Sequence, residues 1–137
     1  MVPMEDVKAS VLRLKKLYFE SMNFRAKPPV EGKISTRVGF KEDHSFDGNN
    51  IHAKLFCRVE SKTESDIFFR MELCLCGEFI SDKTEGIEKM LPNVFSIMFP
   101  YLRTQVTVMT SMPGYPSIVL PALNIVELLK KNKVVEK

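Results

Sequence analysis

The sequence has few of the residues from which catalytic sites are built. It contains only two histidines, His44 and His52, and it has no glycine-rich phosphate loop, nucleophile elbow or metal-binding helix. General acid or base catalysis requires carboxylates or histidines that converge in a cleft. His44 falls in a polar segment beside Glu42 and Asp43, and His52 falls on the polar face of a predicted strand. We therefore expect no catalytic residues and a protein that is not an enzyme.

Cysteine is also scarce, which limits disulfide and metal chemistry. The three cysteines, Cys57, Cys74 and Cys76, are an odd number, and the last two are only two residues apart, which argues against a disulfide framework. A Cys-x-Cys pair can ligate a metal, but zinc sites usually have four ligands at characteristic spacings. Buried strand cysteines are the favoured interpretation, so we expect no metal and no other cofactor.

The sequence lacks the usual signals of membrane insertion and of nucleic-acid binding. Prolines at positions 92, 100, 113, 116 and 121 interrupt the most apolar part of the chain, and no run of about 18 apolar residues remains to span a bilayer. The first ten residues carry acidic side chains and no apolar secretory core, which predicts a cytoplasmic protein. The net charge is +3, with 20 basic residues interspersed among 17 acidic ones, so no basic stripe indicates nucleic-acid binding.

The most informative feature that is present is an almost uncharged stretch from Met90 to Val126. Arg103 is its only charged residue, although 27% of the whole chain is charged. A helix that buries one stripe normally keeps a charged opposite face. A helix without such a face needs cover on two sides, and in a chain this small one side is covered by its own sheet. The pattern therefore predicts that a second subunit covers the other side.

The first half of the chain predicts β-strands. Apolar and polar residues alternate over 34–41, 51–60 and 67–76, and the segment 11–25 is also extended, with a bulge or bend where Lys15 and Lys16 break the alternation. Polar connectors at 42–50 and 61–66 predict antiparallel hairpins.

The second half predicts two helices. The apolar period becomes helical near Pro92, and Pro100 indicates either that the long helix begins there or that it is kinked there. Residues 112–116 must end it, and a shorter helix is expected from Pro121 to about Asn132. The whole chain, 1–137, therefore predicts one α+β domain, in which a four-stranded antiparallel sheet carries one long and one short C-terminal helix on one face.

Four motifs in the second half resemble the signature of SecB, the export chaperone. They are Pro92-Asn93-Val94-Phe95, Phe99-Pro100-Tyr101-Leu102-Arg103, the turn Gly114-Tyr115-Pro116, and Leu120-Pro121-Ala122-Leu123-Asn124-Ile125. Weaker similarity extends over nearly the whole chain, at Leu17-Tyr18, Asn23-Phe24, Glu72, Gly77 and Phe79. The resemblance implies the same fold, assembled as a dimer of dimers.

The resemblance also implies an activity and its sites. Members of the family hold unfolded or partly folded polypeptides without ATP, in apolar grooves between the sheet and the second-helix region. The expected groove residues here are Val30, Phe40, Phe69, Tyr115, Leu120, Ile125 and Leu129. Together with the uncharged helix, the apolar strand face predicts a homotetramer interface at Met71, Leu73, Leu75, Leu102, Val106 and Met109.

The chain departs from the family where the motor protein SecA binds. SecB proteins are acidic and contact SecA through an acidic sheet face and a C-terminal tail, whereas this chain has a net charge of +3 and ends at Lys137, soon after the second helix. The corresponding sheet residues are Ser21, Arg25, Arg70 and Glu72. We expect weak or absent SecA binding. The leading hypothesis is a holdase for non-native proteins, acting in export, and the alternative is an adaptor dedicated to one partner, such as an antitoxin.

Overall fold

Four long strands and two helices form the described part of the chain. The computed structural model describes residues 11–28, 32–64, 66–113, 115 and 117–135. The strands are β1 (Leu12–Ala26), β2 (Ser35–Asp47), β3 (Asn50–Lys62) and β4 (Ile67–Ser81). A 3₁₀ turn, η2 (Ile87–Met90), leads into α1 (Leu91–Thr110), and α2 (Ile125–Val135) follows.

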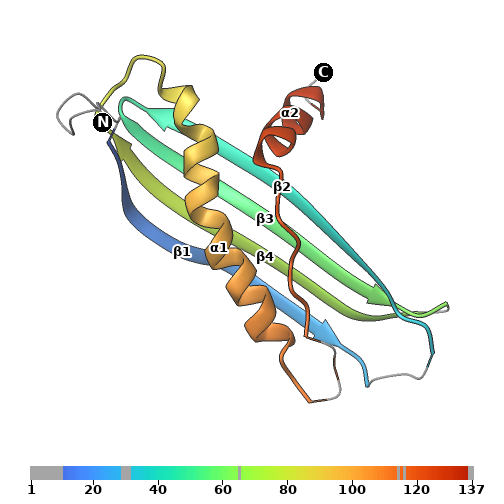
Figure 1. Cartoon of the computed structure of the whole chain (residues 1–137). Coiled ribbons are helices and arrows are strands. Elements are labelled where there is room, and N and C mark those ends of the chain that lie inside the picture. Colours follow the sequence, from blue (N-terminus) through green and yellow to red (C-terminus); the bar gives the residue numbers. More distant parts are fainter. Residues whose placement is uncertain (1–10, 29–31, 65, 114, 116, 136–137) are drawn as a thin grey trace, which may run out of the picture.

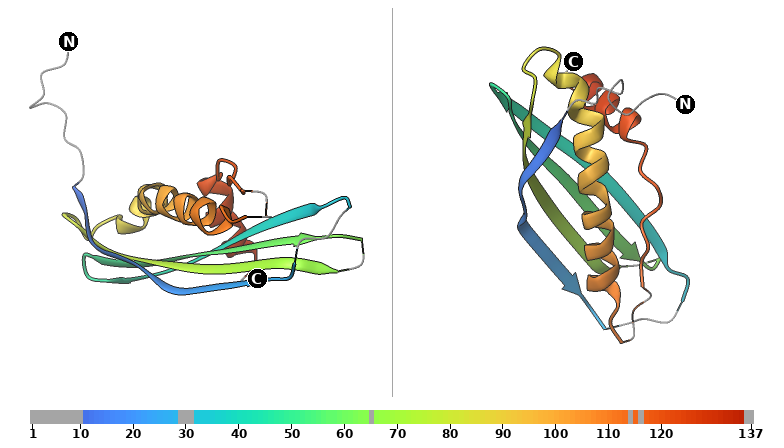
Figure 2. Two further views of the ribbon diagram at one scale, coloured as in Figure 1. Left: turned by 90° about the horizontal axis from the view of Figure 1, so that it is seen from below. Right: turned by 60° about the vertical axis from the view of Figure 1, so that its left-hand side comes forward.

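The strands form one antiparallel sheet in the order β1-β4-β3-β2. Figure 1 shows α1 lying along one face of this sheet, the chain running back beside α1, and α2 ending near β2. The edge-on view in Figure 2 shows both helices on the same side and the opposite face uncovered. The predicted α+β arrangement is confirmed. No helix in the described part of the chain is long and apolar enough to cross a membrane.

The predicted irregularity in the first strand is confirmed, and the structure adds a second one. The register of β1 against β4 shifts between Leu14 and Lys16, which is where the two lysines break the alternation. It shifts again between Phe19 and Ser21, so that Glu20 is the extra residue. A bulge of this kind changes the direction in which the inserted side chain points.

The connector predicted at 42–50 is wrong, because most of it is strand. β2 pairs with β3 without interruption up to Asp47, and the turn is only Gly48 and Asn49. Gly48 has a φ of 59°, the left-handed conformation that two-residue hairpin turns need. His44 therefore lies in a strand, where its Nδ1 is 2.7 Å from an oxygen of the buried Glu42 carboxylate. Pairing of these polar groups allows a charged segment to remain extended.

The helix boundaries correct two further expectations. α1 begins at Leu91 and contains Pro100, so the alternative that it begins near Pro100 is wrong. Pro92 occupies the first turn, where a missing N–H costs nothing. α2 begins at Ile125 rather than Pro121, because the Asn124 side chain caps it by accepting a hydrogen bond from the Glu127 N–H at 3.1 Å.

The core lies between α1 and the inner faces of β3 and β4. The buried stripe of α1 is apolar, with Val94, Phe95, Met98, Leu102 and Val106 all at 0% exposure. Gly77 in β4 lies beneath it: a Cβ at this position would be 2.7 Å from Cε1 of Phe79 and 3.1 Å from Sδ of Met98. The absent side chain thus permits close packing of the helix on the sheet.

Gly77→Ala should destabilise the fold. We expect a loss of about 1–3 kcal/mol in the free energy of unfolding, the usual cost of an extra methyl group in a filled core. Gly39→Ala is the matched control, because Gly39 is also a strand glycine and a Cβ there meets nothing within 4 Å. Urea denaturation of both variants measures the difference, and equal stabilities would contradict the close packing at Gly77.

Candidate functional site

Aromatic side chains gather where the end of β1, the start of β4 and the segment after α1 meet. The rings of Phe24 and Phe69 are 5.0 Å apart in an edge-on arrangement, and those of Phe68 and Tyr115 are stacked at 6.4 Å. The Tyr115 hydroxyl donates a hydrogen bond to the carbonyl oxygen of Lys27 at 2.5 Å. Tyr115 therefore joins two segments that are 88 positions apart in sequence.

A pocket of about 580 Å³ opens beside this cluster. Its apolar walls and basic rim come from the ends of two strands, namely Phe24, Arg25, Ala26, Lys27, Ile67, Phe68, Phe69 and Arg70. Lys27 forms an ion pair with Asp66 at 2.7 Å. Concave sites of this size with apolar walls bind small apolar groups, so the pocket is suited to the side chains of an extended polypeptide.

The predicted groove residues fall into two groups. Phe69 and Tyr115 belong to the aromatic cluster. Ile125 and Leu129 are half-buried on α2, and the ring of half-buried Phe40 in β2 lies 5.9 Å from that of Phe99 in α1. Figure 1 shows that the segment 117–124 runs beside α1 toward α2.

Two of the predicted groove residues need separate comment. Leu120 is 0% exposed, so it belongs to the core and is closed to a client in this conformation. The sequence did not distinguish it from its neighbour Val119, which is 63% exposed. Val30 lies outside the described residues.

Threonines of α1 hold the connecting segment in place. Thr110 is fully buried, and its hydroxyl oxygen accepts a hydrogen bond from the Ile118 N–H at 2.9 Å. The Thr107 hydroxyl donates to the Ile118 carbonyl oxygen at 3.0 Å. No sequence motif marks these threonines, because their contacts depend on a segment that tertiary folding brings beside them.

The predicted subunit interface requires correction. Five of its six residues, namely Met71, Leu73, Leu75, Leu102 and Val106, are at most 2% exposed within the single chain. Strand alternation directs the first three toward α1, which covers them, so they form the core of the monomer. Met109 is half-buried and packs against that core.

Other apolar surfaces remain exposed. Ile97, Tyr101 and Val108 are 36%, 52% and 60% exposed on the outward side of α1. β1 is an edge strand with no partner along its outer side among the described residues, and it exposes Tyr18 and Met22. An open strand edge and an uncharged helix stripe are both suited to pairing with another chain.

The outer face of the sheet is a network of ion pairs. Arg58 lies 3.0 Å from a Glu72 oxygen, and Arg70 lies 3.2 Å from a Glu60 oxygen. At the other end of this face, Lys54 pairs with Glu20 at 3.1 Å, and the Nδ1 atom of His52 lies 3.5 Å from a Glu78 oxygen.

The four residues predicted to face the motor come together on this outer face. Arg25 is the cross-strand partner of Arg70, and Ser21 that of Cys74. Arg25, Arg70 and Glu72 line one shallow pocket with Asn23 and Phe24. Glu72, the acidic residue of the set, already has Arg58 as its partner. The surface therefore presents compensated charge, with two neighbouring arginines, rather than a field of free carboxylates.

Comparison with known proteins places this geometry among SecB proteins. The family model described as preprotein translocase subunit SecB matches residues 6–135. The chain is 29% identical over 137 residues to the protein-export protein SecB of Anaplasma phagocytophilum (strain HZ), with 86% of this chain and 87% of that protein covered.

Two solved structures share the fold at low sequence identity. One is a SecB-like chaperone of Mycobacterium tuberculosis in complex with a ChAD peptide from the HigA1 antitoxin, with a TM-score of 0.69 at 10% identity, covering 82% of this chain and 91% of that one. The other is a protein of unknown function from Streptococcus agalactiae, with a TM-score of 0.50 at 10% identity, covering 84% and 100%.

Proposed function

The chain belongs to the SecB family of preprotein translocase subunits, and on that premise we propose that it is an ATP-independent holdase for extended apolar segments of non-native polypeptides. A role in chaperoning or export follows from the family, and the holding mechanism is the proposal. The observation that supports this mechanism is the aromatic-walled pocket at the end of β1 and the start of β4. By this proposal the protein acts in the cytoplasm, before its clients are exported, and it performs no catalysis.

The geometry supports binding of apolar side chains without chemical specificity. The aromatic cluster supplies apolar area and edge contacts that any bulky apolar side chain can use. From there the half-buried side chains on α2 continue the apolar lining along the same side of the sheet. A client in extended conformation would follow the segment 117–124 from one region to the other.

Substitutions in the aromatic cluster or on α2, the two ends of the proposed client-binding groove, should weaken client binding. We expect Tyr115→Ser or Leu129→Asp to raise the Kd for a reduced, unfolded model protein about tenfold or more, since a buried apolar side chain contributes about 1.5–3 kcal/mol. Tyr18→Ser is the matched control, because Tyr18 is an exposed tyrosine on the opposite face of the sheet. Fluorescence titration measures the Kd, and circular dichroism checks the fold. Unchanged binding by well-folded groove variants would contradict the assignment.

We also propose that the protein assembles as a dimer of dimers. The support is the exposed stripe at Ile97, Tyr101 and Val108 together with the open edge of β1, two separate surfaces that a tetramer would cover.

Light scattering at micromolar concentration should return the mass of four chains. The double variant Tyr101→Glu with Val108→Glu should give a smaller species, because burying unpaired carboxylates is costly. Val119→Glu is the control, since Val119 is as exposed as Val108 but lies outside the stripe. A monomer mass for the unaltered protein would exclude the assembly.

Binding to SecA should be weak or absent. Carboxylates steer association with basic partners, and Glu72, Glu60 and Glu20 on the outer sheet face already pair with Arg58, Arg70 and Lys54. Replacing the neighbouring arginines, as in Arg25→Glu with Arg70→Leu, should strengthen binding. A titration at low ionic strength tests both statements, and submicromolar affinity of the unaltered chain, reduced by Glu72→Ala, would overturn the first.

The second candidate is an adaptor for one partner. The observation in its favour is the antitoxin peptide held by the M. tuberculosis SecB-like chaperone, which has this fold. Co-purification from the native cell separates the candidates: a broad set of unfolded proteins supports the holdase, and a single stoichiometric partner supports the adaptor.

A further inference from the structure

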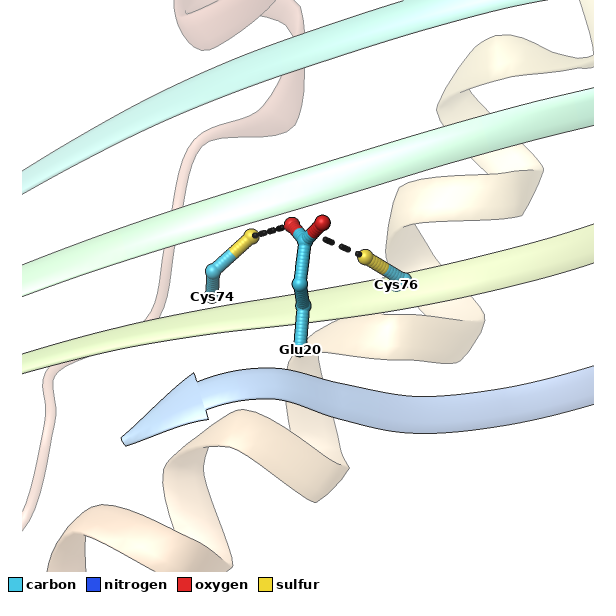
Figure 3. A group of neighbouring side chains, drawn as sticks. All are labelled: Glu20, Cys74 and Cys76. Atoms are coloured by element: carbon cyan, nitrogen blue, oxygen red, sulfur yellow. Dashed lines mark hydrogen bonds between the residues drawn. The ribbon is translucent and has the colours of Figure 1, made fainter.

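Two thiols and a carboxylate converge on the outer face of the sheet, away from the proposed client site. Cys74 and Cys76 both direct their sulfur atoms toward one carboxylate oxygen of Glu20, with Sγ–Oε2 distances of 3.4 Å and 3.7 Å (Figure 3). The three donor atoms all lie within 4.8 Å of one another. The cysteines come from β4 and the glutamate from β1, so the group spans two neighbouring strands.

The bulge in β1 creates this arrangement. Cys74 and Cys76 are two positions apart, and side chains at i and i+2 of a strand share a face. Phe19 pairs with Leu75 and Ser21 pairs with Cys74, so Glu20 is the inserted residue between them. In a regular strand Glu20 would pair directly with Cys74, as Tyr18 pairs with Cys76. The insertion instead places the carboxylate between the two sulfurs.

The thiols are poorly suited to nucleophilic or redox-sensor chemistry. Burial raises the pKa of the Cys74 thiol to about 12 and also raises that of the Cys76 thiol. Reactive cysteines have lowered pKa values and accessible sulfurs, whereas these two residues are 3% and 4% exposed. Their convergence on a shared carboxylate suits ligation instead, because a bound divalent cation itself displaces the thiol protons, which are released to water.

We propose that Cys74, Cys76 and Glu20 form a binding site for a thiophilic divalent cation of the zinc class. Zinc takes thiolate, imidazole and carboxylate ligands, with Zn–S bonds of about 2.3 Å, so two thiolates on one ion are less than about 4.6 Å apart. Separations of at most 4.8 Å therefore require only small movements of the side chains. Because Glu20 is exposed, water can occupy the fourth ligand position of the ion.

Lys54 is the group that competes with the cation. Its ammonium nitrogen lies 3.1 Å and 3.3 Å from the two Glu20 oxygens. In the absence of metal it neutralises the carboxylate, and a bound cation must displace it. Removal of this charge should therefore strengthen cation binding, which a cation held by the two thiols without Glu20 would not show.

A cation at this site would fasten β1 to β4. β1 is the edge strand with two interruptions of register, and one ligand from it joined to two from β4 would stabilise the pairing only in the folded chain. Ligands that bind the native state alone raise its stability by mass action, so the melting temperature should rise with zinc.

Titration of the reduced full-length protein with Cd²⁺, followed by the ultraviolet thiolate–cadmium absorption band, tests the site. We expect one ion per chain, with Zn²⁺ competing for it. Cys74→Ser and Cys76→Ser should each abolish the two-thiolate band, and Glu20→Gln should weaken binding by about tenfold or more, the lower end of losses when groups that tune a metal site are removed. Lys54→Gln should tighten binding.

The third cysteine provides a matched control. Cys57 is a buried strand cysteine on the helix-facing side, in register with Phe40 and Leu73. Cys57→Ala should retain both the absorption band and the rise in melting temperature with Zn²⁺. The proposal is overturned if the unaltered protein binds no ion, if binding survives in the Cys74→Ser variant, or if Glu20→Gln and Lys54→Gln leave the affinity unchanged.

Discussion

The packing of α1 on β3 and β4 is the constraint on which the rest of this structure depends. The helix carries no acidic residue in its first turn and no basic residue in its last turn, so burial of its apolar stripe supplies most of what holds it in place. Gly77 permits the close approach, and the buried Thr110 then fixes the segment that returns beside the helix. The position of Tyr115 over the ends of β1 and β4 follows from this packing.

The two faces of the sheet have different physical roles. The inner face is apolar and largely covered by α1, and one pocket lies where the end of β1 meets the start of β4. The outer face is open to solvent, and its charges are neutralised in cross-strand pairs such as Arg58 with Glu72. Such pairs contribute little stability individually, but they remove the free carboxylates that a basic partner would need. The same face carries the Glu20–Cys74–Cys76 group at a place where β1 departs from regular register.

Much of the fold could be predicted because the relevant signals are local. Alternation in 51–60 and 67–76 identified β3 and β4, and the paired Lys15 and Lys16 marked the first bulge. The polar composition of 42–50 led to the wrong prediction of a connector. His44 pairs with the buried Glu42, two positions away on the same strand face, and composition alone does not reveal such a pair. Pro100 left two helix starts open, and only the packing of residues 91–99 on the sheet decided between them.

The sequence by itself determined the family, the four strands, the two helices and the single helix-bearing face, because periodicity and motifs along the chain specify these. Tertiary structure alone decided which apolar residues are core and which are surface. Met71, Leu102, Tyr101 and Val108 are all apolar or aromatic. The packing of α1 on the sheet buries Met71 and Leu102, which face each other's element, and leaves Tyr101 and Val108 exposed. Tertiary structure also decided that Glu20 stands between two cysteines more than fifty positions away. An inserted residue in one strand sets that geometry, and neither strand specifies it alone.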